Sequence, residues 1–515
     1  MFKKFLLVSA MVLTSASADA KWFKASSKHF VVYADDSETN IRSFTERLER
    51  FDKAIRVWHV AKEDTRGPSA RVTVFLLDDV GAIERLSGRR SVAGFYEPRA
   101  GTSVAFSPRI GSGDLSAQAI LFHEYTHHWM LTNWTDAAMP PWFIEGFAEL
   151  HATALFRGDR VIFGAVPIYR RYTVGQMNLL PMSRMLKFDL GQLSSQETDA
   201  LYSHGWALTH YLTFDPERRK LLADYIAALN SGKSVSPAAL VAGGGDLDLK
   251  LNSYVRRSTL PSAAFDFNEL PIDTVDVRPL SVAEAAMMPA LILSQRGVSK
   301  KNAPEATALA RKLAAPFPND PSAQNELAEA EYDLCSTDDA IPADCFGRAE
   351  AAADRALAAD PQSIHALLYK GMAQVAALKR GKISDQARWT GARRWFLAAN
   401  KIDTEAPEPL IAYYDSFTAA GAPASANAQS ALLYAYALAP YDSTLRLRAG
   451  AVYLRQGKLA DARNAIAPVA YNVDGGSITT PAQKVLKALD AGDSKAALAE
   501  LEKAEKPESD QASNK

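Results

Sequence analysis

The stretch Leu121-FHEYTHHW-Met130 decides how the N-terminal half of this chain is interpreted. Apolar residues around it recur at helical spacing, which predicts an amphipathic helix. His123 and His127 are four positions apart, so both side chains project from one face of that helix, one turn apart. Two imidazoles so arranged can bind one metal ion, and Glu124 can meet a water that the metal holds. The alternative is a pair of histidines on a polar helix face, but a chance H-E-x-x-H is expected only about 0.01 times in such a chain.

A second segment, Pro140-PWFIEGFAE-Leu150, predicts another helix close by. Pro141 suits a first helical turn, because proline has no N–H to leave unsatisfied there. Glu145 follows His127 after seventeen intervening residues, and Glu149 lies one turn beyond Glu145 on the same face. The aromatic residues of the segment are left to pack this helix against the first one.

H-E-x-x-H followed by W-[FIL]-x-E-G-[FL]-A resembles the gluzincin (HExxH…E) zinc metallopeptidases, which are peptidase MA-like. The sequence around these motifs is similar in pattern to the aminopeptidase N branch of that family. The resemblance implies a Zn²⁺ site in which His123, His127 and Glu145 are the ligands and Glu124 is the general base. The family's usual gap before the third ligand is eighteen residues, one more than in this chain. The resemblance also implies an α+β zincin-type metallopeptidase domain, which we place at residues 21–275.

The same resemblance implies two further functional residues. The family's downstream Tyr-x-Lys-Gly motif is matched by Tyr202-Ser-His-Gly205, in which His204 replaces the lysine. The match implies that Tyr202 would stabilise the oxyanion. The family's upstream G-x-M-E-N motif is only partly matched by Gly94-Phe-Tyr-Glu97-Pro98. Glu97 is therefore either a group that binds the substrate's amine or a solvated hairpin carboxylate, and exopeptidase activity is not supported.

Glu149 has two interpretations from its position alone. A carboxylate one turn beyond a metal ligand can hydrogen-bond a zinc-bound histidine, which orients the ring and raises its basicity. The alternative is that Glu149 is simply solvated.

Secondary-structure patterns in the first half alternate between strand and helix. Short runs rich in Val, Phe and Tyr predict strands at 29–35 and 71–78, with a helix over 37–60 between them. Residues 92–108 predict a hairpin, and the chain from 115 onward is expected to be mainly helical. Strands early and helices late indicate an α+β arrangement.

Beyond about residue 275 the sequence becomes alanine-rich and helical. Turn-like junctions at Pro321, Pro361, Thr404 and Pro440 are separated by 40, 43 and 36 residues. This pattern resembles tetratricopeptide (TPR) repeats, whose unit is about 34 residues of helix-turn-helix. We therefore predict an all-α helical-repeat (TPR-like) domain over 276–505, able to bind a protein partner. The alternative is an irregular α-helical domain.

The two ends of the chain and its two cysteines bear on its compartment. Residues 1–20 combine a basic start, a short apolar run and an A-x-A site, which is typical of a cleavable signal peptide. No later segment is apolar enough to span a bilayer, so the mature protein is expected to be periplasmic or secreted. An oxidising compartment favours a disulfide between Cys335 and Cys345, although two free thiols are the alternative. The polar tail 506–515 is expected to be disordered.

Composition narrows the function classes. Lys and Arg total 58 against 59 Asp and Glu, and this net charge of −1 argues against nucleic-acid binding. The leading hypothesis is an exported zinc-dependent peptidase that acts on a peptide or protein substrate. One alternative is a TPR scaffold with a catalytically inactive metallopeptidase-like domain. The other is a structural zinc site, which fits poorly because such sites are usually closed cages rich in cysteine.

Overall fold

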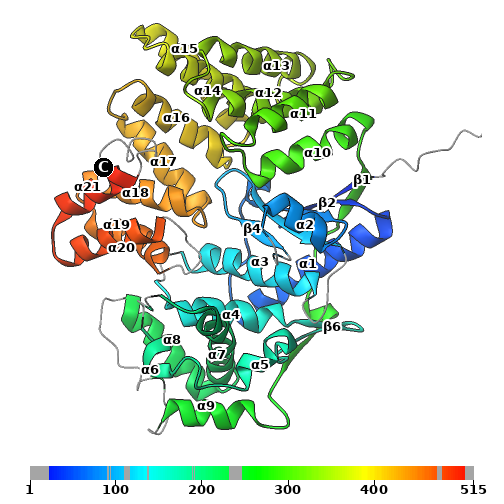
Figure 1. The fold of residues 1–515 in the computed structure, drawn as a ribbon, viewed down its shortest axis with the longest axis vertical. Coiled ribbons are helices and arrows are strands. Elements are labelled where there is room, and N and C mark those ends of the chain that lie inside the picture. Colours follow the sequence, from blue (N-terminus) through cyan, green and yellow to red (C-terminus); the bar gives the residue numbers. More distant parts are fainter. Residues whose placement is uncertain are drawn as a thin grey trace, which may run out of the picture.

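The computed structural model describes residues 22–504 except 90, 91, 93, 110–115, 136, 137, 188, 189, 191, 231–239, 241–245 and 472–477. The predicted signal peptide at 1–20 and the predicted tail at 506–515 lie outside the described residues. Figure 1 shows the chain as an N-terminal domain built on a sheet, followed by a long arc of helices.

A six-stranded mixed sheet forms the centre of the N-terminal domain. Its strands lie in the order β4-β5-β3-β2-β1-β9, so β4 is an edge strand. The pairs β2–β3 and β3–β5 are parallel and the other pairs are antiparallel. The strands are β1 (Trp22–Ser26), β2 (Phe30–Asp35), β3 (Val72–Leu77), β4 (Phe95–Glu97), β5 (Ser103–Pro108) and β9 (Asp276–Pro279).

Helices cover both faces of this sheet. On one face, α1 (Glu38–Trp58) and α3 (Ala117–Asn133) meet through Phe51 and Phe122, whose ring centroids are 3.8 Å apart. On the other face lie α2 (Val80–Ser87) and α10 (Val282–Arg296), which bury Ile83 and Met288 against β3 and β5. The strands and the helix predicted between 29 and 78 are confirmed as β2, α1 and β3, and the hairpin as β4–β5.

The predicted boundary after residue 275 is too early. β9 pairs with β1 and completes the central sheet, so the N-terminal domain extends at least to Pro279. The sequence showed no strand there because β9 is only four residues long, and most of its side chains are exposed.

A helical lobe, in the lower part of Figure 1, follows α3 and contains a second, small sheet. Its helices are α4 (Pro141–Ala152), α5 (Arg171–Val174), α6 (Met182–Met185), α7 (Ser195–Thr213), α8 (Pro216–Asn230) and α9 (Leu247–Val255). The sheet is formed by β6 (Leu155–Arg157), β7 (Arg160–Phe163) and β8 (Ala263–Asp266). These strands were not predicted, because three or four residues are too few to show alternation.

The C-terminal half is an array of helical repeats. After α10 come α11 (Ala303–Ala314), α12 (Pro321–Ser336), α13 (Phe346–Ala359), α14 (Ile364–Arg380), α15 (Gln386–Ile402), α16 (Pro407–Ala419), α17 (Ala426–Leu438), α18 (Ser443–Arg455), α19 (Leu459–Ala470), α20 (Thr479–Asp490) and α21 (Ser494–Ala504). The four predicted junctions lie at or just before the starts of α12, α14, α16 and α18, so the predicted repeat spacing matches the helices. A disulfide joins Cys335 to Cys345 between α12 and α13.

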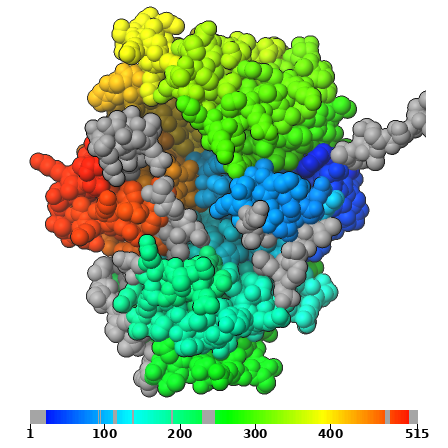
Figure 2. Space-filling view, viewed as in Figure 1, coloured from blue at the N-terminus to red at the C-terminus, as the bar shows by residue number. Residues whose placement is uncertain are grey.

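The array contacts the N-terminal domain at both of its ends. It starts with α10 on the sheet, passes over the domain, and brings α18–α21 to the other side of α3 (Figure 1). Green and yellow-green residues of the array lie directly above blue residues of the N-terminal domain in Figure 2. Ala100 and Ala138 of the N-terminal domain are buried in apolar clusters that otherwise consist largely of array residues. Among the described residues, no helix has both the length and the apolar character needed to cross a membrane.

Candidate metal centre and active site

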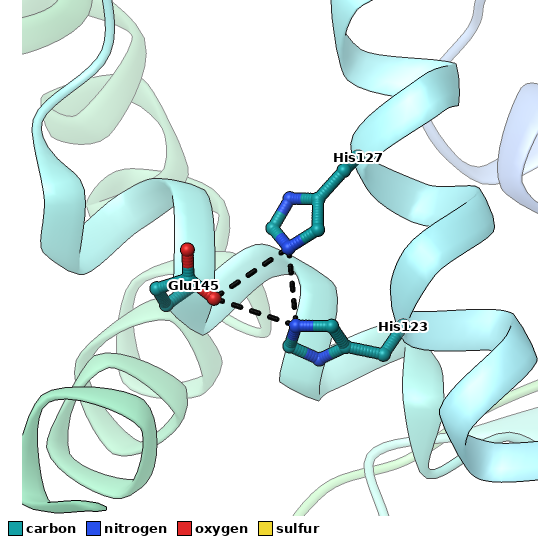
Figure 3. A group of neighbouring side chains, drawn as sticks. All are labelled: His123, His127 and Glu145. Carbon is teal, nitrogen blue, oxygen red and sulfur yellow. Dashed lines mark hydrogen bonds and ion pairs between the residues drawn. The ribbon is translucent and has the colours of Figure 1, made fainter. Parts of the chain in front are cut away.

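Two helices bring His123, His127 and Glu145 together. The Nε2 atoms of the two histidines of α3 lie 3.0 Å apart. Oε2 of Glu145, on α4, lies 3.4 Å from the His123 Nε2 and 3.5 Å from the His127 Nε2 (Figure 3). Within the part of the chain that the structure describes, this is the one group of His, Cys, Asp or Glu side chains with atoms close enough to hold a metal ion.

The chemistry of the group fits a zinc ion. Two imidazole nitrogens and one carboxylate oxygen are a donor set that leaves a fourth position open, as in catalytic zinc sites. Donor atoms around a tetrahedral zinc with bonds of about 2.0–2.1 Å are about 3.3 Å apart, which is close to the three distances observed.

The Glu145 side chain supplies a second test of this fit. This residue is fully buried, and apart from the two imidazoles neither carboxylate oxygen has a hydrogen-bond partner. Burial alone raises the pKa of Glu145, but the imidazoles of His127 and His123 lower it to about 2. A buried carboxylate without a donor is costly. A cation held between Glu145 and the histidines would remove that cost.

The position of Glu145 depends on a close approach of two helices. α4 crosses α7 where Gly146 meets Gly205, and a Cβ on Gly146 would lie only 2.2 Å from the carbonyl oxygen of Gly205. A side chain at either position would therefore push the helices apart. The glycine in the E-G-[FL]-A pattern is explained by this crossing, which also fixes the distance between Glu145 and Tyr202.

Glu124 lies beside the ligand group and lines a cavity of about 160 Å³ together with His127. Tyr96 and Pro98 from the region of β4 contribute another part of the lining. Glu97 is not among the lining residues, because consecutive side chains of a strand point to opposite faces. Tyr96, and not Glu97, therefore lines this cavity, and both interpretations of Glu97 stay predictions.

Tyr202 lies on the opposite side of the site, next to His123. The two ring centroids are 5.8 Å apart, and the guanidinium of Arg170 lies 4.5 Å from the centre of the Tyr202 ring. His204 does not share this surface: its two ring nitrogens lie 3.1 and 3.2 Å from the backbone carbonyl oxygens of Leu180 and Gln176.

Glu149 approaches His123 without hydrogen-bonding it. Its Oε1 lies 3.7 Å from the His123 Nδ1, which is too long for a hydrogen bond. Instead, Tyr169 donates a hydrogen bond of 2.7 Å to Glu149, and Arg170 lies 3.0 Å from the same carboxylate. The predicted hydrogen bond from a ligand histidine is thus absent, because the closer guanidinium and hydroxyl orient the carboxylate. The alternative of a solvated Glu149 is also wrong, since the residue is 1% exposed.

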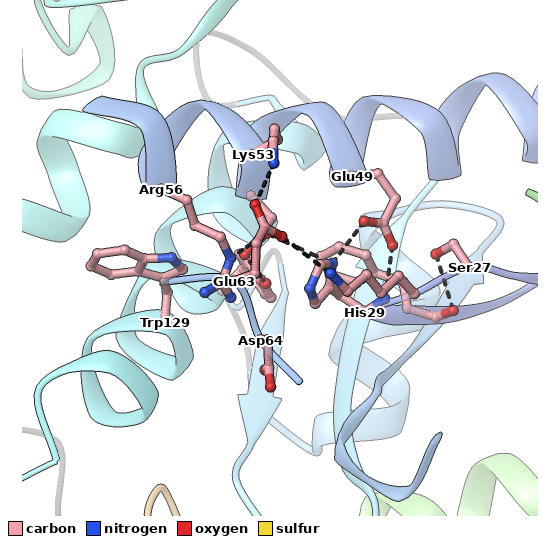
Figure 4. A network of polar contacts seen from close by, with 12 residues as sticks. Ser27, His29, Glu49, Lys53, Arg56, Glu63, Asp64 and Trp129 are labelled. Carbon is pink, nitrogen blue, oxygen red and sulfur yellow. Dashed lines mark hydrogen bonds and ion pairs between the residues drawn. The ribbon is translucent and has the colours of Figure 1, made fainter. Parts of the chain in front are cut away.

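A buried polar network connects α3, the helix that carries His123 and His127, to α1. Tyr125 donates a hydrogen bond of 2.7 Å to Asp52, which also accepts one of 2.6 Å from Arg56. Nearer the start of α1, Glu49 accepts a hydrogen bond from the backbone N–H of His29 and lies 2.7 Å from the His29 ring (Figure 4). The signal that could have revealed this network is the charged side chains of Glu49, Asp52 and Arg56 on the face of α1 that also carries its apolar residues.

Comparisons with known proteins found similarity to solved structures alone. No family model and no curated protein matches this chain. A thermophilic TPR protein from Thermus thermophilus matches 41% of the chain over 100% of its own length, at 16% identity and a TM-score of 0.31. PilF from Pseudomonas aeruginosa matches 42% of the chain over 88% of its own length, at 17% identity and a TM-score of 0.30. Both TM-scores are low, so the repeat architecture rests on the helix pairs of this chain itself.

Proposed function

We propose that this protein is a zinc-dependent peptidase with a gluzincin-type site, which its predicted signal peptide directs to the periplasm or the medium. The observation that carries the proposal is the group formed by His123, His127 and Glu145. Its three donor atoms lie within 4.8 Å of one another, and the buried carboxylate has no other hydrogen-bond partner. The expected substrate is a peptide or an unfolded segment of a protein.

When bound, zinc lowers the pKa of a water and polarises a substrate carbonyl. Glu124 is the residue suited to accept the proton of the attacking water and to deliver it to the leaving amine. Its carboxylate lines the same cavity as His127, although it does not belong to the group of close donor atoms.

Two residues on the His123 side would complete the reaction. Tyr202 can donate a hydrogen bond to the oxygen on which negative charge develops. Arg170 holds the face of the Tyr202 ring and the Glu149 carboxylate at once, so it would keep Tyr202 in place as substrate binds.

The substitution Glu124→Gln tests the proposal. Glutamine keeps the shape of the side chain but cannot accept a proton, and general-base catalysis is typically worth about 10²–10⁴-fold. We expect turnover of a cleaved peptide to fall by that factor while zinc content and thermal stability stay at wild-type values. The measurements are cleavage of a peptide library by the zinc-loaded protein and metal analysis of the same samples.

Two comparisons complete the test. Glu305→Gln makes the same chemical change on the exposed surface of α11 and is expected to leave turnover unchanged. Glu145→Ala removes a proposed ligand and is expected to lose zinc. Full zinc content in Glu145→Ala, or unchanged turnover in Glu124→Gln, would contradict the proposed site.

A protein-binding scaffold is the second candidate function. It is favoured by a cavity of about 820 Å³ in the array, lined by side chains that include Tyr332, Phe346 and Phe396. If the wild-type protein cleaves no peptide and Glu124→Gln leaves the cellular phenotype intact, this function is the better account.

A further inference from the structure

The cavity beside Glu124 is not built by the N-terminal domain alone. Ser443, the first residue of α18, and Pro468, within α19, line it together with Glu124 and His127. More than 300 residues separate these two groups in the sequence, so the proposed active site and the last repeats share one wall.

Hydrogen bonds fix the array part of this wall to the N-terminal domain on two sides. Asp442, which caps α18, accepts a hydrogen bond of 2.8 Å from the backbone N–H of Ala100 in the β4–β5 hairpin. Arg446 is 1% exposed and donates a hydrogen bond of 2.8 Å to the carbonyl of Thr135, which follows α3. Ser443 lies between these two anchors along the chain, so its place at the cavity is determined by both.

The cavity is apolar away from its catalytic side. Its other walls include Met130, Leu131, Trp134, Met139 and Ile144. The ionisable groups among its lining residues are Tyr96, Glu124 and His127, so a charged substrate side chain would lose its hydration without a dedicated partner. A volume of about 160 Å³ matches one apolar side chain, because a cavity of about 150 Å³ accommodates a benzene ring.

The edge strand would direct such a side chain into the cavity. β4 ends the order of the sheet, so an extended peptide can add to its outer edge. Tyr96 and Pro98 are two positions apart and both line the cavity, so a peptide lying along β4 passes its mouth.

We infer that this cavity binds an apolar substrate side chain next to the bond that is cleaved, and that Ser443 and Pro468 of the repeat array set the size of side chain accepted. The inference rests on the proposed peptidase function. It makes the array a part of the substrate site, with medium to large side chains such as Leu, Met and Phe preferred at one position.

Opposite changes in cavity size test this inference. With the zinc-loaded full chain and a peptide library, Ser443→Leu should lower kcat/KM for Phe relative to Ala at that position by at least tenfold. Pro468→Ala should widen the cavity and raise the relative kcat/KM for Trp several-fold. The matched control is Ser494→Leu, because Ser494 is also the first residue of a repeat helix after an aspartate but does not line the cavity.

A binding measurement separates specificity from catalysis. In the Glu124→Gln background, Ser443→Leu should weaken binding of the Phe peptide at least tenfold and leave binding of the Ala peptide unchanged. If both wall variants keep the wild-type cleavage profile while the wild type cleaves peptides, the inference is overturned and the peptidase function stands. If the wild type cleaves nothing in the library, both are overturned.

Discussion

At the scale of single residues, the candidate site is asymmetric. Tyr202 and Arg170 lie beside His123, whereas Glu124 and the apolar cavity lie beside His127. A peptide bound between them would have its carbonyl near Tyr202 and a side chain in the cavity. In the proposed peptidase, polarisation of the substrate carbonyl would then belong to one side of the site and substrate selection to the other.

Tyr202→Phe is expected to lower kcat about tenfold or more and to change KM little. A hydroxyl that stabilises a developing oxyanion acts in the transition state, so its loss does not weaken binding of the substrate. Steady-state kinetics of the zinc-loaded variant would check this. Tyr172→Phe is the control, because Tyr172 is 66% exposed. Unchanged kcat in Tyr202→Phe would exclude Tyr202 as the oxyanion donor.

At the scale of elements, the contact between α4 and α7 determines whether the site forms. α3 provides its two histidines through local spacing alone, but Glu145 reaches them because α4 is held at the right distance. The crossing at Gly146 and Gly205 leaves no room for a Cβ on either side. Packing at one glycine pair therefore positions a metal ligand and Tyr202 together.

Gly146→Ala is expected to lower the free energy of unfolding by about 1–3 kcal/mol, because overpacking at a tight contact forces the backbones apart. Gly391→Ala, in the interior of α15 with no atom within 4 Å of the added Cβ, should instead raise it by about 0.5–1 kcal/mol. Urea denaturation of both variants measures these changes. Equal stability of Gly146→Ala and wild type would show that the crossing is looser than described.

At the scale of the whole molecule, several histidines are buried in the neutral form. Burial lowers the pKa of His151 to about 3 and that of His210 to about 4, and it lowers the pKa of His59 well below its usual value. His59 and His151 share a hydrogen bond of 3.0 Å between their Nε2 atoms. Protonating either ring would break this bond or leave a buried charge.

These histidines are therefore expected to lower the stability of the protein as pH falls from 7 to 5, whereas Glu326, Asp333 and Glu408, whose pKa values are raised by burial, act in the opposite direction. Below about pH 6.5 the unfolded chain takes up protons on these histidines and the folded chain does not, so each one costs about 1.4 kcal/mol per pH unit at most. His365 has the opposite sign: facing Glu329 raises its pKa to about 9 against the effect of burial, so its contribution is lost as pH rises above about 6.5.

Thermal unfolding of the wild type and of single-histidine variants between pH 5 and 9 measures both contributions. In His151→Gln the loss of unfolding free energy between pH 7 and 5 should be smaller than in wild type, by up to about 1.4 kcal/mol per pH unit. An equal loss of stability in His151→Gln and in the wild type between pH 7 and 5 would contradict the neutral state of the pair formed by His59 and His151.

The sequence alone determined the features that depend on local spacing. His123 and His127 share a helix face because they are four residues apart, and the repeat junctions follow from a period of about 40 residues. β2, α1 and β3 were predictable for the same reason, since strand and helix periodicity are read over a few neighbouring residues.

Only the tertiary structure decided what lies next to these local features. It brought Arg170 and Tyr169 to Glu149, turned Tyr96 rather than Glu97 toward the cavity, and set Ser443 and Pro468 opposite Glu124. These contacts join residues that are tens to hundreds of positions apart. No local pattern encodes them, because they depend on how whole helices and strands pack and on which charged groups must find a partner when they are buried.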